Sequence, residues 1–122
     1  MRNLAIAAAL LSASTLSQAA HKDVIAFKMT GDCNWSEYME VVGDFNDWAT
    51  PLGYNAEIFM PHDADDLETY YWVGTSADFT AFGAAYEKWM AGVMAGDSDP
   101  ARLNDRLAEC MQNESRSSYI AF

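Results

Sequence analysis

Basic residues are scarce in this chain: 7 Lys and Arg stand against 18 Asp and Glu, for a formal net charge of −11. The basic residues form no cluster, and the acidic residues are spread along the chain and not gathered in a tail. Such a field repels phosphate backbones and anionic lipid head groups. We therefore expect no nucleic acid and no membrane among the partners, and solubility explains the acidity more simply than a cationic ligand does.

Motifs that would name a reaction are also missing. The chain has no phosphate-binding glycine loop, no nucleophilic triad and no Cys-x-x-Cys pair. One of its 2 histidines, His62, lies in the acidic tract of residues 61–68. The spacing there matches neither an EF-hand loop nor a zinc signature, so we expect a solvated hairpin tip and no metal site.

Long hydrophobic runs are absent too. The apolar stretch at residues 4–11 is much shorter than the about 20 residues that a membrane span needs. It follows Arg2 and precedes the small residues Ser17, Ala19 and Ala20, an order typical of a cleaved secretory signal peptide. We expect residues 1–20 to be removed, and the mature chain to begin near Ala20 or His21 as a soluble periplasmic or secreted protein.

Cysteine is limited to Cys33 and Cys110. In an oxidising compartment such a pair forms a structural bridge, and two residues allow a single connectivity. Closing this long loop stabilises the fold by about 4 to 5 kcal/mol on the chain-entropy model. A catalytic or metal-binding thiol pair is the alternative, which the spacing and the lack of a neighbouring histidine disfavour.

The remaining residues, 21–122, are too few for two domains. Asn34 with Glu37, and Thr75 with Asp78, are capping signals at the starts of two helices. The apolar spacing predicts strands at 24–29, 54–60, 67–73 and 118–122, and helices at 35–49, at 77–94 and after Asp99. This order is the α+β, ferredoxin-like βαββαβ pattern with one extra short helix before the last strand. Right-handed crossovers place all the helices on one face of a four-stranded antiparallel sheet.

Period-two alternation divides the strand residues between a covered face and a bare one. To the face beneath the helices it assigns Ile25, Phe27, Met29, Tyr54, Ile58, Met60, Tyr71, Val73, Ile120 and Phe122. To the bare face it assigns Val24, Ala26, Lys28, Asn55, Glu57, Phe59, Tyr70, Trp72 and Tyr119. An exposed aromatic sheet face marks an interface or a ligand site, and a second copy of the chain is its simplest cover.

Over residues 70–79, Tyr-Tyr-Trp-Val-Gly-Thr-Ser-Ala-Asp-Phe, the chain resembles the strand-to-helix passage of small monooxygenase-like and stress-responsive members of the dimeric α/β-barrel superfamily. The resemblance implies two protomers packed sheet against sheet around a cavity. Haem-using members carry an iron-ligating histidine on the following helix, and residues 77–94 contain none. We therefore expect no cofactor. Trp72 resembles the tryptophan of the cofactor-independent monooxygenases, whereas the first-strand asparagine of some members is missing from residues 24–29.

Two charged residues, Lys28 and Glu57, fall among aromatic residues on the predicted bare face. A buried charge is costly unless it is paired or hydrated, so they could form an ion pair lining a wet cavity, or simply reach solvent at its rim. If catalysis occurs, we expect Glu57 to act as general base and Lys28 to stabilise developing negative charge. The predicted ligand-binding residues are Asn55, Tyr70, Trp72 and Tyr119.

These expectations give two hypotheses of function. The first is an exported homodimer that binds a small aromatic or carbonyl compound and oxidises it without a cofactor. The second is a non-catalytic binding or protein-interaction module that uses the open sheet face. The sequence does not identify the ligand or the reaction.

Overall fold

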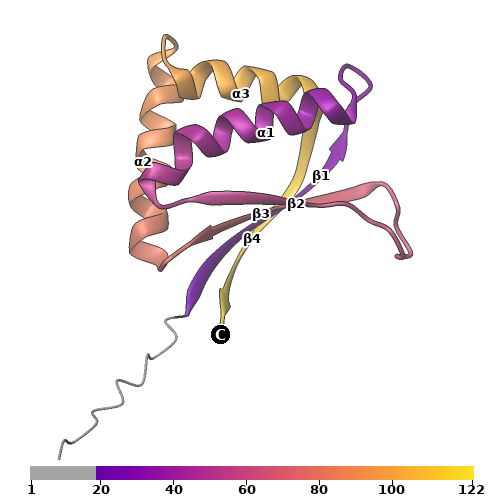
Figure 1. The fold of residues 1–122 in the computed structure, drawn as a ribbon, viewed down its shortest axis with the longest axis horizontal. Coiled ribbons are helices and arrows are strands. Elements are labelled where there is room, and N and C mark those ends of the chain that lie inside the picture. The colour runs from indigo at the N-terminus through magenta and orange to yellow at the C-terminus, as the bar shows by residue number, and fades with distance from the viewer. Residues whose placement is uncertain (1–18) are drawn as a thin grey trace, which may run out of the picture.

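The computed structural model describes residues 19–122 and shows a four-stranded antiparallel sheet with three α-helices on one side (Figure 1). In chain order the elements are β1 (Ala20–Met29), α1 (Trp35–Ala49), the 3-10 helix η1 (Thr50–Leu52), β2 (Asn55–Phe59), β3 (Thr69–Ser76), α2 (Phe79–Ala95), α3 (Asp99–Cys110) and β4 (Met111–Ala121). The strand order in the sheet is β2-β3-β1-β4. The predicted ferredoxin-like α+β class is confirmed, including the extra helix before the last strand. Most of the predicted leader, residues 1–18, lies outside the described residues.

Capping side chains determine where the helices begin. The side chain of Asn34 accepts a hydrogen bond from the Glu37 amide at 2.9 Å, and the Glu37 carboxylate accepts one from the Asn34 amide at 3.0 Å. This capping box confirms the predicted start of α1. Helix α2 begins later than predicted, because Asp78 is its N-cap and Thr75 still belongs to β3.

The register of β3 corrects the predicted face of four residues. Trp72 lies directly opposite Ile25 of β1, and directly opposite residues share a face. Trp72 and Tyr70 therefore lie beneath the helices, whereas Tyr71 and Val73 lie on the open face. The prediction was wrong for all four, because this strand is apolar on both faces and its alternation carries no information about which face is inner.

The residues of β1, β2 and β4 keep their predicted faces, but Met60 and Phe122, predicted beneath the helices, lie just past the ends of β2 and β4 and are exposed. The pairing places Val24, Ala26, Lys28, Asn55, Glu57 and Phe59 on the open face, and Tyr119 pairs with Lys22 on that same face. Strand β4 is longer than predicted, because it starts directly at the end of α3. This extension brings Arg116 into the sheet.

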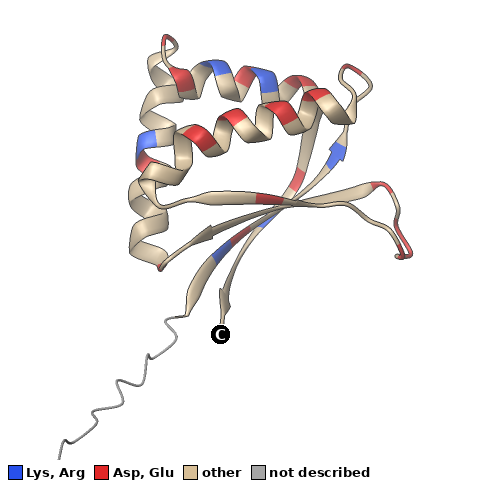
Figure 2. Ribbon diagram, in the orientation of Figure 1, with Lys and Arg blue, Asp and Glu red and all other residues tan. Residues whose placement is uncertain are grey.

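The core lies between the sheet and the helices. Phe27 and Tyr38 are 0% exposed there. The predicted disulfide is confirmed: Cys33, in the loop after β1, is bonded to Cys110 at the end of α3. Acidic residues are spread over α1, α3 and the β2–β3 hairpin (Figure 2). Within residues 19–122, no helix has both the length and the apolarity needed to span a bilayer.

Candidate functional site

A cavity of about 330 Å³ lies between the helices and the inner face of the sheet. This volume is at the lower end of the about 300 to 1,000 Å³ typical of small-molecule sites. Seven aromatic residues line it: Phe45, Trp48, Tyr54, Trp72, Phe82, Tyr86 and Trp89. These rings belong to α1, α2, β3 and the residue before β2, so the cavity exists only once the layers have packed.

A chain of hydrogen bonds runs through the polar wall of this cavity. The indole Nε1 of Trp72 donates to the Tyr54 hydroxyl at 2.7 Å, and that hydroxyl donates to Oδ2 of Asp23 at 2.8 Å. Asp23 is 0% exposed, so its carboxylate needs these protein donors in place of water. Burial, and then the negative charge of Asp23, raise the pKa of Tyr54. Tyr54 therefore stays protonated and acts as a donor to Asp23.

Arg116 provides the balancing charge for Asp23. Its Nε donates to Oδ1 and its Nη2 to Oδ2, each at 2.8 Å, which is a bidentate pair. The guanidinium also lies over the rings of Tyr86 and Phe82, at 5.0 and 5.8 Å from the ring centroids. The hydrogen bonds to Asp23 raise the pKa of Arg116. The cation is thus held at one position on the cavity wall.

This arrangement leaves donors available to a ligand. Arg116 has five N–H groups, and the two hydrogen bonds to Asp23 use only part of them. The side chains of Asn104 and Asn113 also line the cavity, and neither forms a hydrogen bond within residues 19–122. The aromatic walls can hold a flat apolar ring system, while these donors can bind an oxygen atom on it. The described residues hold no cluster of three His, Cys, Asp or Glu side chains suited to a metal ion.

The residues predicted for a site do not meet in one space. Trp72 lines the cavity beneath the helices. Tyr70 lies on the same side of the sheet but packs against Phe27 and Trp35, with ring centroids 5.6 and 5.7 Å away. The other four predicted residues, Lys28, Glu57, Asn55 and Tyr119, lie on the open face.

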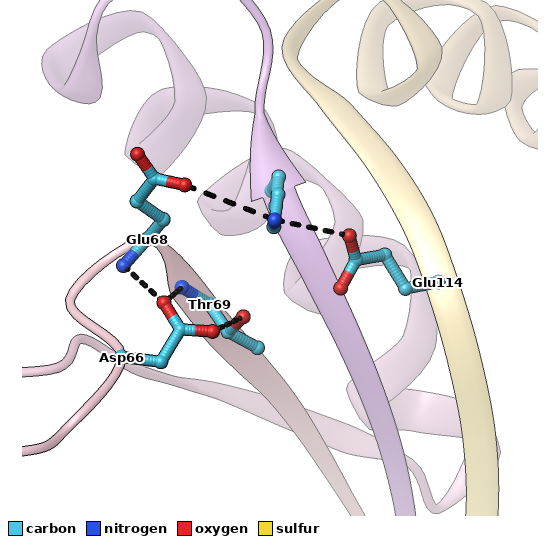
Figure 3. Close-up of polar contacts among 5 residues, drawn as sticks. Asp66, Glu68, Thr69 and Glu114 are labelled. Carbon is cyan, nitrogen blue, oxygen red and sulfur yellow. Dashed lines mark hydrogen bonds and ion pairs between the residues drawn. The ribbon is translucent and has the colours of Figure 1, made fainter.

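Lys28 and Glu57 do not pair with each other. Glu57 is on β2 opposite Val73, whereas Lys28 is near the far end of β1, two strands away. The Lys28 ammonium lies 3.5 Å from Glu114 and 3.8 Å from Glu68 (Figure 3). All three of these side chains are partly or largely exposed, so the ion pairs contribute little stability. The catalytic roles of Lys28 and Glu57 stay predictions.

The sequence did not predict Asp23 or Arg116 as site residues. It placed Tyr54 on the covered face but did not predict the hydrogen bonds of its hydroxyl. The predicted first strand started at Val24, one residue after Asp23. Extending the alternation back from Ile25 would have placed a carboxylate on the inner face, which is the signal that a basic partner is needed. Nothing in the sequence pairs it with Arg116, because the two residues are 93 positions apart.

No protein-family model and no curated protein sequence matches the chain. Solved structures do match it. SnoaB, a cofactor-independent oxygenase from Streptomyces nogalater, aligns with a TM-score of 0.57 and 14% identity over 85% of this chain and 94% of that one.

Two Bacteroides proteins align less closely. A dimeric protein of ferredoxin-like fold from Bacteroides fragilis gives a TM-score of 0.46 and 11% identity, over 83% of this chain and 95% of that one. A possible oxidoreductase from Bacteroides thetaiotaomicron gives a TM-score of 0.49 and 6% identity, over 84% of this chain and 98% of that one. The resemblance expected from residues 70–79 is confirmed at the level of the fold: this chain has the ferredoxin-like fold that it shares with SnoaB.

Proposed function

We propose that the cavity between the helices and the sheet binds a small planar aromatic compound that carries an oxygen atom, and that the chain oxidises this compound with O₂ without a cofactor. One observation carries the proposal. The wall of a cavity lined by aromatic rings includes the Arg116 cation, which is held by Asp23 and has N–H groups that Asp23 does not use. The shared fold with a cofactor-independent oxygenase supports the choice of reaction.

The reaction that fits converts an activated methylene group beside a carbonyl-bearing ring system into a second carbonyl. The substrate supplies the electrons: R₂CH₂ and O₂ give R₂C=O and H₂O. Solvent accepts a proton from the methylene carbon, which places negative charge on the substrate oxygen, and the two hydrogens of the methylene group end in the water that is formed. The Arg116 guanidinium, fixed by Asp23, is positioned to stabilise that charge as it develops. Fixed donors of this kind need no reorganisation during the reaction.

Anthrone is a suitable probe, because it is flat, carries a carbonyl oxygen and has an activated methylene group. We expect the protein to accelerate the formation of anthraquinone from anthrone in air, with one O₂ consumed for each molecule formed. Absorbance and an oxygen electrode measure both quantities. Arg116→Met should remove most of the acceleration. A rate no higher than that of the spontaneous reaction would overturn the proposed oxidation.

Export is part of the proposal. The Cys33–Cys110 disulfide fits a compartment that oxidises thiols. We propose that residues 1–20 direct the chain to the periplasm or the medium and are removed. Mass spectrometry of the exported protein should find Ala20 or His21 as its first residue, and an intact leader on the exported protein would contradict this.

The second candidate function is interaction through the open sheet face, as a homodimer or with another protein. It is favoured by three aromatic residues on that face, Phe59, Tyr71 and Tyr119, which are 54%, 44% and 56% exposed. Lys28, Glu57 and Asn55 would then lie in or beside the interface. If two facing sheets enclosed a cavity, any reaction would take place in that cavity with Glu57 as general base. Glu57→Gln would then abolish turnover.

A further inference from the structure

We propose that Asp23 sets the charge preference of the cavity: by neutralising Arg116 it makes the site select a neutral acceptor oxygen, as in a ketone or quinone, over a carboxylate. This inference rests on the proposed binding of an aromatic ligand, and it does not require that the ligand be oxidised. Asp23 acts here as a positioning residue, since the group that would touch the ligand is Arg116.

The geometry commits one edge of the guanidinium to Asp23. Both carboxylate oxygens of Asp23 accept from Arg116 at 2.8 Å, and Oδ2 also accepts from Tyr54. The carboxylate is 0% exposed and is therefore fully engaged within the protein. The guanidinium also makes cation–π contacts with the rings of Tyr86 and Phe82. The edge of the guanidinium that faces Asp23 is occupied, so a ligand oxygen that binds Arg116 must accept from its remaining N–H groups.

The charges on the cavity wall then decide between ligands. Among the described residues that line the cavity, only Asp23 and Arg116 are charged, and their charges balance. A carboxylate bound to Arg116 would lose part of its hydration, and the nearby negative charge of Asp23 would cancel much of its attraction to Arg116. The chain's net charge of −11 adds further repulsion. A carbonyl oxygen accepts the same hydrogen bond and costs far less to desolvate.

Two probes of matched shape test this preference: 2-acetylnaphthalene, a neutral ketone, and 2-naphthoate, its carboxylate counterpart. Equilibrium dialysis at pH 7.5 and moderate salt measures both dissociation constants. We expect the ketone to bind at least tenfold more tightly than the carboxylate. Equal binding, or tighter binding of the carboxylate, would overturn the inference while leaving the proposed cavity in place.

Replacing Asp23 provides the decisive variant. In Asp23→Asn the charge of Arg116 is no longer compensated, so the ratio of ketone to carboxylate affinity should shift at least tenfold toward the carboxylate. Asp63→Asn removes the same charge from the exposed hairpin and should leave the ratio unchanged. A merely structural role for Asp23 would weaken both probes alike, and an unchanged ratio would overturn the inference.

A second variant covers the case in which Asp23→Asn does not fold. Arg116→Met changes a side chain that is 44% exposed and removes the donor. The ketone should then bind no better than 2-ethylnaphthalene, which has no acceptor oxygen, and the carboxylate should bind more weakly than it does to the wild type. Retained preference for the ketone over the hydrocarbon would overturn the inference. Failure of all three probes to bind the wild type would overturn the proposed cavity function as well.

Discussion

The phenol ring of Tyr54 occupies the space beside Gly74 in which any other residue would carry its Cβ. Gly74 lies on the inner face of β3, directly opposite Asp23 on β1. The missing side chain lets the Tyr54 hydroxyl reach both Asp23 and the indole of Trp72. The polar wall of the cavity therefore depends on a residue that contributes no functional group.

Gly74→Ala should displace Tyr54 and break this hydrogen-bond chain. We expect a loss of about 1 to 3 kcal/mol in the free energy of unfolding, from overpacking. Denaturant unfolding measures the loss. Gly43→Ala is the matched control, because Gly43 lies in α1 with nothing within 4 Å of its added Cβ; it should be neutral or stabilising by up to about 1 kcal/mol. Equal stability of the two variants would contradict the packing.

Alkaline conditions should destabilise the fold through its buried tyrosines. Burial raises the pKa values of Tyr38 and Tyr54 above the ordinary value of about 10. Above that pH the unfolded chain releases these protons and the folded chain retains them, so stability falls as the pH rises. The stabilising contribution is fully present below pH about 10.

Tyr38→Phe should make this alkaline decline less steep. The Tyr38 hydroxyl donates to the sulfur of Met111, a weak acceptor, so its removal should cost little at neutral pH. Melting temperatures measured between pH 8 and 11 test the slope, and Tyr119→Phe, at an exposed position, is the control. Parallel curves for the wild type and Tyr38→Phe would show that Tyr38 does not cause the decline.

Reduction of the disulfide should lower the melting temperature by several degrees or more. The bond joins residues 77 positions apart, and the chain-entropy model assigns such a long loop about 4 to 5 kcal/mol. The double variant Cys33→Ser, Cys110→Ser should have the melting temperature of the reduced wild type, and adding reductant should not change it. An unshifted melting temperature, with reduction confirmed by mass spectrometry, would contradict this contribution.

Filling the cavity should block aromatic ligands without unfolding the chain. Ala85 of α2 is 6% exposed and lines the cavity, whereas its neighbour Ala84 is exposed. Ala85→Leu should weaken the binding of 2-acetylnaphthalene at least tenfold, and Ala84→Leu should not change it. Circular dichroism checks that both variants remain folded. Unchanged binding to Ala85→Leu would place the ligand elsewhere, the open sheet face being the next candidate.

The open face should drive self-association. Analytical ultracentrifugation at micromolar concentration should give a dimer, and Tyr71→Lys, which places a charge at the centre of that face, should give a monomer. Met94→Lys is the control, since Met94 is exposed at the far end of α2. A monomeric wild type would contradict the predicted homodimer, and with it any cavity between facing sheets.

Local sequence signals determined much of this fold. Asn34 and Glu37 specify the start of α1 by a hydrogen-bond exchange over three residues, and apolar spacing distinguishes the helices from the strands. Two cysteines leave only one possible disulfide. Each of these features depends on residue identity and on spacing along the chain, so each could be predicted without knowing which strands pair.

The tertiary structure alone decided the location of the candidate site. Strand β3 presents aromatic residues to both faces, so only its pairing with β1 places Trp72 beneath the helices and Tyr71 on the open side. Asp23 and Arg116 meet because β1 and β4 are neighbours in the sheet, although they are 93 residues apart in the chain. Alternation predicts that two faces exist, but strand register determines which side chains share a cavity.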